Sequence, residues 1–259
     1  MNAELVSVAE AAMEIATATL VRTEPGVRSM AKGPRDLVTT VDIAIENAVR
    51  GFLAEETPEI GFIGEETGES PAAGLRWVLD PIDGTVNFSR GLPTFAISLT
   101  LIDSASAVLA LADSPRLRER YMATRGGGGS LNGSPLVASS PDSIGESLVC
   151  LDDFAPGGKF VAERAALYTA LSPKVMRIRS TGSAALDLAW LAAGRVDAVI
   201  MMSNQPWDTA GGVLMAREAG AFVADLKGAP HEISSTSLLA ASSNVAAGIL
   251  NIINAVNQS

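Results

Sequence analysis

The most constraining segment of this chain is a short apolar run that ends in two closely spaced aspartates. Trp77–Leu79 leads directly into Asp-Pro-Ile-Asp-Gly-Thr at positions 80–85. The run predicts a strand that ends at Asp80, because the proline forces a turn and the glycine relaxes the backbone behind it. Thr85 can then begin a short helix, whose first N–H groups lack helical partners and suit a phosphate. Alone, the aspartate pair would be interpreted as an acidic turn that caps a helix.

Three other segments place carboxylates beside the ends of predicted elements. Glu65 follows a short apolar strand, and Asp42 begins a predicted helix. Asp208 lies near the start of another helix, directly after Trp207. Each of these is ordinary by itself, since an aspartate at a helix start is usually a cap. The informative feature is that all of them occur in one chain.

Composition leaves carboxylates as the main groups available for catalysis. The 259 residues include one cysteine, Cys150, and one histidine, His231. A single cysteine excludes an internal disulfide and a CxxC motif, and a single histidine excludes sites built from several histidines. No serine has a recognisable nucleophile elbow around it, which disfavours a Ser-His-Asp triad. Carboxylates suit hard cations such as Mg²⁺.

Charge and hydropathy exclude several classes of protein. With 19 basic and 29 acidic residues the net charge is −10, which argues against a nucleic-acid partner. A hydrophobic content of 47% excludes a disordered chain. Glu4, Glu10 and Glu14 interrupt the N-terminal apolar pattern, so we predict no signal peptide. The apolar region 184–202 contains charges and predicts no membrane span. We therefore expect a cytoplasmic protein.

Hydrophobic periodicity predicts alternating helices and strands, and hence sheets covered by helices. The predicted helices are 3–22, 42–53, 159–171, 183–193, 208–219 and 244–256. The predicted strands are 60–63, 76–79, 94–102, 107–112, 120–124, 175–179, 196–201 and 221–224. Residues 24–34 are predicted to be a loop. The glycine-rich residues 126–133 are predicted to form a hairpin rather than a phosphate loop, because Asn132-Gly133 favours a tight turn.

Together the acidic segments make the chain resemble the inositol monophosphatase family of Mg²⁺-dependent, lithium-sensitive phosphatases. The resemblance runs from about Glu10 to Ala221. It implies alternating layers of helix and β-sheet, of the inositol monophosphatase and fructose bisphosphatase type. It also implies an N-terminal α+β part at 1–143, with most metal ligands, and a C-terminal α/β part at 144–259. A homodimer is implied, and so is a small-molecule phosphate ester as substrate.

The resemblance implies two to three Mg²⁺ ions, for which Mn²⁺ can substitute. Glu65, Asp80 and the Ile82 carbonyl resemble the ligands of the first ion. Asp80, Asp83 and Asp208 resemble those of the second. A third, weaker ion is implied near Glu65 with mostly water ligands.

The same resemblance implies how water and phosphate are held. Thr85 and Asp42 resemble the pair that orients the attacking water, and Glu65 belongs to the same catalytic set. The N–H groups of Gly84 and Thr85 would hold the phosphate, beside Asp83. Lys32 resembles a loop lysine near the active site. Cations would neutralise the phosphoryl oxygens and lower the pKa of a water, so we predict direct attack by water without a phosphoenzyme.

The substrate alcohol is implied to lie against Gly182, Ser183 and Ala184, although Ser183 could equally be a plain helix cap. Met201 stands where inositol-preferring members carry a glutamate, and a thioether accepts hydrogen bonds only weakly. The substrate could therefore be a nucleoside, sugar or other metabolite phosphate. Alternatively, Asn204 replaces the glutamate and inositol 1-phosphate remains the substrate.

A second class of function is a regulatory or interaction protein built on the same fold, with little phosphatase activity. Such a protein would be expected to lose some of the acidic residues. Asp42, Asp80 and Asp208 are all present, as are the other members of the set. The sequence therefore favours catalysis.

Overall fold

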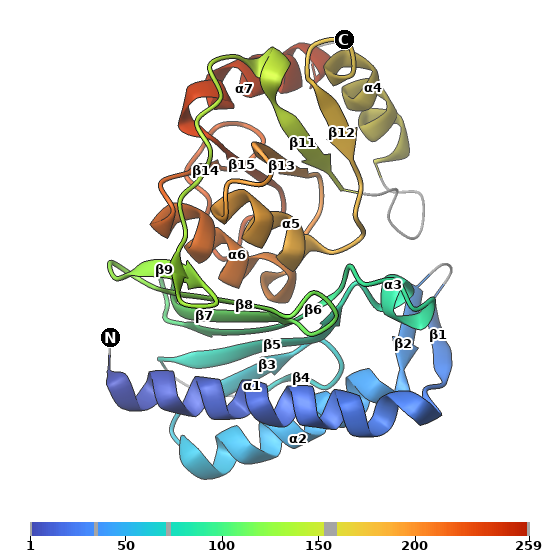
Figure 1. Cartoon of the computed structure of the whole chain (residues 1–259), viewed down its shortest axis with the longest axis vertical. Helices are drawn as coiled ribbons and strands as arrows, with labels where there is room; N and C mark the ends of the chain where they lie inside the picture. Colours follow the sequence, from blue (N-terminus) through green and yellow to red (C-terminus); the bar gives the residue numbers. More distant parts are fainter. Residues whose placement is uncertain (1, 34–35, 71–73, 153–159, 258–259) are drawn as a thin grey trace.

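The protein is a stack of five layers in which helices and β-sheets alternate (Figure 1). The computed structural model describes residues 2–33, 36–70, 74–152 and 160–257. One outer layer holds α1 (Ala3–Thr23) and α2 (Thr40–Glu56). The central layer holds α5 (Ala184–Ala192) and α6 (Pro206–Glu218), and the other outer layer holds α4 (Val161–Leu171) and α7 (Ser243–Asn257). This confirms the predicted layered fold.

The first sheet has eight strands in the order β10-β9-β8-β7-β6-β5-β3-β4, and only β3 and β5 pair in parallel. Alternate side chains along each strand point to opposite faces of the sheet, so the two faces bury different residues. Ile97 and Leu99 pack toward α1 and α2, whereas Ala96 and Ala110 pack toward α5 and α6. The strands are β3 (Gly61–Gly64), β4 (Gly68–Glu69), β5 (Arg76–Asp83), β6 (Ala96–Ile102), β7 (Ala107–Ser114), β8 (Glu119–Thr124), β9 (Gly128–Leu131) and β10 (Ser134–Pro135).

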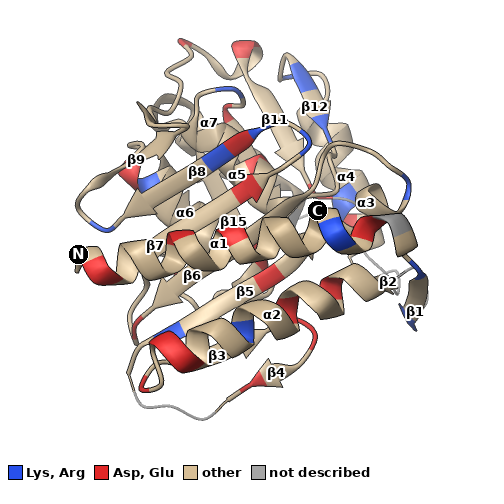
Figure 2. Ribbon diagram, turned by 60° about the horizontal axis from the view of Figure 1, so that its bottom comes forward, with Lys and Arg blue, Asp and Glu red and all other residues tan. Residues whose placement is uncertain are grey.

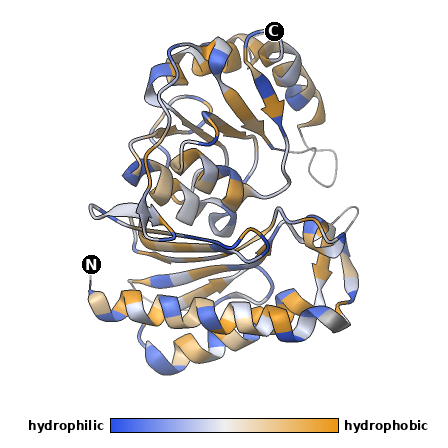
Figure 3. Cartoon of the chain, viewed as in Figure 1, coloured by the Kyte–Doolittle hydropathy of each residue, from blue (hydrophilic) through white to orange (hydrophobic). Residues whose placement is uncertain are grey.

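The second sheet has five strands in the order β12-β11-β13-β15-β14. The first three pair in parallel and the last two in antiparallel fashion. Figure 3 shows the hydrophobic colour of β11, whereas the edge strand β12 carries two exposed arginines. The sheet lies between the central helices and the outer pair α4 and α7. The strands are β11 (Leu148–Leu151), β12 (Arg177–Arg179), β13 (Ala198–Met201), β14 (Phe222–Ala224) and β15 (Leu238–Ala241).

The remaining elements are short. A hairpin of β1 (Ser29–Gly33) and β2 (Asp36–Thr39) precedes α2, and the one-turn helix α3 (Thr85–Ser89) follows β5. Two 3₁₀ turns lie at Glu24–Gly26 and Ile144–Glu146. Acidic residues outnumber basic ones on both α1 and α2 (Figure 2).

Most predicted elements are present, and the hairpin prediction is confirmed. Asn132 and Gly133 have φ of 48° and 82°, as a tight turn between β9 and β10 needs. The prediction of a loop at 24–34 is wrong, because β1 lies within it. The strands β2, β4, β11 and β15 were not predicted. The predicted helix at 159–171 is α4, which begins at Val161, and residue 159 lies outside the described residues.

The predicted end of the strand at Asp80 is also wrong. β5 continues to Asp83, and its register against β6 shifts, so that Asp80 lies opposite Ser98 and Asp83 opposite Ala96. Three steps along β5 thus match two along β6, which is the geometry of a bulge. Pro81 cannot donate a ladder hydrogen bond, and the bulge accommodates it without ending the strand.

No helix in the described parts of the chain has both the length and the apolar character that crossing a membrane requires. The division into parts at 1–143 and 144–259 stays a prediction. The first sheet ends at β10 and the second begins at β11, but both pack on the same central helices.

Helix α6 lies unusually close to its neighbours at two adjacent glycines. A Cβ at Gly211 would lie 2.5 Å from the Thr100 hydroxyl of β6, and one at Gly212 would lie 2.4 Å from the Leu188 Cβ of α5. A larger residue would push α6 away from β6 at position 211 and away from α5 at position 212.

We predict opposite effects for two glycine-to-alanine substitutions in helices. Gly212→Ala should lower the free energy of unfolding by about 1–3 kcal/mol, because the new methyl group overpacks the α5–α6 contact. Gly51→Ala is the matched control, since nothing lies within 4 Å of its Cβ position. It should raise the free energy of unfolding by about 0.4–1 kcal/mol. Urea denaturation measures both, and equal effects would contradict the close packing of α6.

Candidate active site

The bulge of β5 presents two buried aspartates at the edge of the central layer. Asp80 and Asp83 are 2% and 8% exposed. Oδ1 of Asp80 accepts a hydrogen bond of 3.0 Å from the N–H of Ile82. The Asp83 carboxylate accepts from the Ser183 hydroxyl, and from the N–H groups of Ala184 (3.2 Å) and Ala185 (2.7 Å). Asp83 therefore caps the N-terminus of α5 and ties the first sheet to the central helices.

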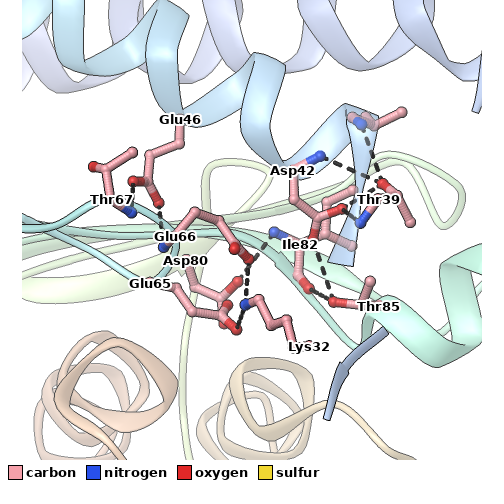
Figure 4. A network of polar contacts seen from close by, with 11 residues as sticks. Lys32, Thr39, Asp42, Glu46, Glu65, Glu66, Thr67, Asp80, Ile82 and Thr85 are labelled. Carbon is pink, nitrogen blue, oxygen red and sulfur yellow. Dashed lines mark hydrogen bonds and ion pairs between the residues drawn. The ribbon is translucent and has the colours of Figure 1, made fainter. Parts of the chain in front are cut away.

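Asp42 and Thr85 meet beside this bulge (Figure 4). Asp42 is fully buried in the first turn of α2, where the Thr39 N–H and hydroxyl both donate to its Oδ2. The Thr85 hydroxyl lies 3.3 Å from Oδ1 of Asp42 and 3.0 Å from the Ile82 carbonyl oxygen. Burial raises the pKa of Asp42, against the opposing effect of the Thr39 hydrogen bonds. The geometry leaves Thr85 next to a carboxylate that can receive a proton.

A second acidic group follows β3, where Lys32 of β1 lies between two glutamates (Figure 4). Its Nζ is 2.8 Å from Glu65 Oε1 and 2.5 Å from Glu66 Oε1. Burial alone would lower the pKa of Lys32, but the hydrogen bonds and charges of the two glutamates raise it above its ordinary value. Burial raises the pKa of Glu66 to about 7 although Lys32 opposes the shift. The lysine thus supplies a cation to a strongly acidic pocket.

Asp208 brings the final carboxylate from the start of α6. Its Oδ2 accepts a hydrogen bond of 2.7 Å from the N–H of Gln205. Burial, together with the charges of Asp83 and Glu65, raises its pKa to about 7 against the opposing effect of the Gln205 hydrogen bond. Burial raises the pKa of Asp80 well above its usual range, with added repulsion from Glu65, Asp83 and Asp208. The four carboxylates are therefore close enough to disfavour one another's charge.

The residues at this site fit a hard divalent cation in their chemistry. Within the described residues, no group of three or more His, Cys, Asp or Glu side chains is already arranged to hold a metal ion. Glu65 instead contacts Lys32, Asp83 caps α5, and Asp208 accepts from Gln205. All the candidate ligand atoms are oxygens, including the Ile82 carbonyl oxygen, which accepts a hydrogen bond of 3.0 Å from the Thr85 hydroxyl. Oxygen ligands suit Mg²⁺, and a divalent cation would relieve the repulsion among buried carboxylates.

A cavity of about 200 Å³ opens beside Asp83 and Asp208. The predicted alcohol-binding residues Gly182, Ser183, Ala184 and Met201 all line it. Ser183 also caps α5, since its hydroxyl accepts from the N–H of Leu186 at 3.4 Å. The structure brings these residues together, and their roles in binding stay predictions.

Asn204 does not lie among the described residues that line the cavity. Its amide donates to the Thr209 hydroxyl at 3.1 Å and to the Ser235 carbonyl at 3.0 Å. The replacement of a glutamate at position 201 by Asn204 stays a prediction.

Asp152 lines the cavity with Met201 and was not predicted from the sequence. Asp152 accepts two hydrogen bonds from the buried Arg164, at 3.0 Å and 2.6 Å, and one from the N–H of Met202 at 2.9 Å. It directly follows β11, a strand that the periodicity did not reveal. An acidic residue after a short apolar run was the available signal.

Two further buried acids were also missed. Asp187 lines the cavity from α5, and burial raises its pKa to about 7. Glu46 lies on α2 one turn after Asp42 and is fully buried. The spacing of four residues between Asp42 and Glu46 on one helix was the signal that could have found it.

Comparisons with known proteins agree on one family. Residues 1–258 match the model of the "Inositol monophosphatase family". Among curated proteins, "Inositol-1-monophosphatase ImpA" of Mycolicibacterium smegmatis is 36% identical over 96% of this chain and 91% of its own length. "Nus factor SuhB" of Escherichia coli K12 is 35% identical over 88% of this chain and 86% of its own length. The crystal structure of extragenic suppressor protein suhB from Bartonella henselae has a TM-score of 0.90 and 30% identity, and covers 96% of this chain and 98% of that chain.

We predict that Asp208→Asn makes the metal-free protein more stable at pH 8. The pKa of Asp208 rises on folding from its ordinary value of 3.8 to about 7, so its neutral form favours the folded state. That stabilisation is fully present below pH 4 and is lost as the pH rises through 7. Asparagine keeps the acceptor for Gln205 without the charge. In EDTA the variant should exceed wild type by on the order of 1 kcal/mol at pH 8 and by much less at pH 5, as measured by urea denaturation. A less stable variant at pH 8 would contradict the repulsion described above.

Proposed function

The chain belongs to the inositol monophosphatase family, and we propose that it hydrolyses a small phosphate monoester with the help of divalent cations. The observation that carries this proposal is the meeting of Glu65, Asp80, Asp83 and Asp208 beside the N-terminus of α3 and an open cavity. A phosphate monoester repels nucleophiles through its own charge, so a site for it needs cations. The buried carboxylates are suited to hold them.

We propose that Glu65, Asp80, Asp83, Asp208 and the Ile82 carbonyl hold two Mg²⁺ ions, with a third, weaker ion near Glu65. When bound, these ions neutralise the phosphoryl oxygens and the leaving alkoxide and acidify a water molecule. The finer predictions of the ion count, Mn²⁺ substitution, lithium sensitivity, a homodimer and a cytoplasmic location belong to the same proposal.

The chain's own groups orient the reaction. Thr85 would hold the attacking water through its hydroxyl, and the buried carboxylate of Asp42, 3.3 Å from that hydroxyl, would take up the proton. The N–H groups of Gly84 and Thr85 lie at the start of α3, where no side chain caps the helix, and they would bind the phosphate. Holding water and phosphate in line supplies much of the rate enhancement.

Direct attack by water is favoured over a phosphoenzyme. Cys150 is buried and contacts Asp187, and burial raises the pKa of its thiol above the ordinary range. His231 lines a separate cavity with Arg217, and its pKa is lowered to about 4 by burial. Neither residue offers a nucleophile to the site beside Asp83.

The alcohol part of the substrate is proposed to lie in the cavity between Ser183 and Met201. Met201 is buried and offers a thioether in place of a carboxylate. Asp152 lines the same cavity, and Arg164 and Met202 already occupy three of its acceptor positions. One lone pair of Asp152 Oδ1 remains for a substrate hydroxyl. A polyol or a sugar phosphate is compatible with this wall.

The alternative is a regulatory or interaction protein on the same fold. The relative of Escherichia coli that is named a Nus factor favours this alternative. The complete acidic set and the Thr85–Asp42 contact favour catalysis, because an interaction surface has no need of buried, mutually repelling carboxylates.

We predict that Asp83→Asn lowers phosphate release by about a thousandfold, which corresponds to roughly 4 kcal/mol of transition-state stabilisation. Asparagine can still accept from the N–H of Ala185 but has lost the charge that a cation needs. Asp142→Asn is the control, since Asp142 is an exposed carboxylate far along the chain. Phosphate release is measured with Mg²⁺ on inositol 1-phosphate, fructose 1,6-bisphosphate, histidinol phosphate, AMP and phosphoadenosine phosphate.

The panel separates the outcomes. Preference for inositol 1-phosphate would mean that Met201 does not exclude it. Preference for another ester would make Met201 the determinant, and Met201→Glu should then shift activity toward inositol 1-phosphate. Wild-type turnover by Asp83→Asn would refute the cation assignment, and no release from any ester would favour the regulatory alternative.

Cation binding should also stabilise the wild-type fold. At a free Mg²⁺ concentration of 100 times its Kd, the free energy of unfolding should rise by about 2.7 kcal/mol. Asp83→Asn should show a much smaller increase at the same concentration. Chemical denaturation with Mg²⁺ and with EDTA measures both, and an equal response of the two proteins would contradict the proposed ligand set.

A further inference from the structure

Glu46 is a charged residue buried entirely within the protein, and none of the roles described above uses it. It lies on α2, one turn after Asp42, and its side chain has no exposed surface. A buried carboxylate is costly unless hydrogen bonds compensate for its lost hydration. The hydrogen-bond partners of the Glu46 carboxylate therefore indicate the role of this residue.

The partners of Glu46 are two consecutive backbone N–H groups (Figure 4). Its Oε2 accepts from the N–H of Glu66 at 2.9 Å, and its Oε1 accepts from the N–H of Thr67 at 2.7 Å. These N–H groups lie in the turn between β3 and β4, immediately after Glu65. Hydrogen bonds to a carboxylate are among the stronger ones in proteins, so this contact fixes the backbone that carries the acidic pair.

The contact between Glu46 and the turn is possible because residue 64, which lies against the Glu46 carboxylate, is a glycine. A Cβ on residue 64 would lie 2.4 Å from the carboxyl carbon of Glu46, which is closer than atoms can approach. Arg50, one further turn along α2, donates to the Thr67 hydroxyl and lies over the Phe62 ring at 5.3 Å. Successive turns of α2 thus contact the β3–β4 turn on one side of the acidic site.

We propose that Glu46 is a positioning residue for cation binding, an inference that rests on the proposed function. Asp42 and Glu46 belong to one rigid helix, so a single element sets both the Asp42–Thr85 pair and the turn that carries Glu65. The Glu46 carboxylate fixes the backbone directly after Glu65, and it would thereby hold the Glu65 side chain in place for a cation. Loss of the contact frees the turn, and cation affinity falls while the chemistry at saturating cation is retained.

Glu46→Gln tests this directly, because its amide oxygen can accept one N–H but its NH₂ group faces the other. We expect Mn²⁺ affinity, measured by titration calorimetry without substrate, to fall at least tenfold. The rate at saturating Mg²⁺ should stay within about threefold of wild type. Amide hydrogen exchange at Glu66 and Thr67 should become faster, which reports the contact independently of any cation.

Val49→Ala is the matched control for a purely structural effect. Val49 lies on the same helix, is fully buried, and packs in the apolar core. It should lower the free energy of unfolding without changing Mn²⁺ affinity by more than about twofold. If Glu46→Gln lost stability but bound Mn²⁺ as tightly as Val49→Ala, the inference would be overturned.

A double-mutant cycle with Gly64 gives a second test that does not need Glu46→Gln to fold. Gly64→Ala should displace the Glu46 carboxylate and weaken Mn²⁺ binding about tenfold. In a Glu46→Ala background nothing remains to displace, so the same substitution should change affinity less than twofold. Equal losses in both backgrounds would refute the inference. If the wild-type protein bound no divalent cation, the proposed function would fail, and this inference would fail with it. If the wild-type protein bound Mn²⁺ tightly and substitution of Glu46 had no effect on the affinity, only this inference would be overturned.

Discussion

The repulsion among Glu65, Asp80, Asp83 and Asp208 is the constraint on which the rest of the molecule depends. Burial and neighbouring charge raise the pKa of Asp80, Asp83 and Asp208, so the folded chain works against its own electrostatics at this point. Such an arrangement survives only where the surrounding fold is stable enough to impose it. The acids come from β5, the turn after β3, and α6. Asp80, Asp83 and Asp208 each accept a hydrogen bond from a separate backbone N–H, and Glu65 pairs with Lys32.

The layered architecture provides that stability by sharing one helical layer between two sheets. Asp83 caps α5, so a side chain of the first sheet completes the hydrogen bonding of a helix that also packs on the second. Helix α6 carries Asp208 into the same place and can approach α5 and β6 because Gly211 and Gly212 have no side chains. The acidic site is therefore joined to the core packing, and neither can shift without the other.

Sequence patterns predicted the long elements and the acidic residues, because both leave a local signal. The helix at 3–22 repeats its apolar residues every three or four positions, and residues 80–85 combine a proline, a glycine and two aspartates. β11 and β15 have four apolar residues each and no alternating pattern, and such a run does not by itself distinguish a strand from part of a buried helix. Glu46 and Asp152 were missed because their partners, the Thr67 N–H and Arg164, are defined only by the folded chain. The bulge at Pro81 likewise depends on pairing with β6.

The position of Lys32 between Glu65 and Glu66 has a consequence for ion exchange. The ammonium group of Lys32, on β1, already places one positive charge in the acidic pocket. A divalent cation that took the place of this ammonium would replace one charge with two, so the pocket would gain a single unit of charge. Lys32 would then no longer be paired with both glutamates, and its positive charge could attract an anion. Uptake of the metal and the attraction of a phosphate would in this way be two results of one exchange.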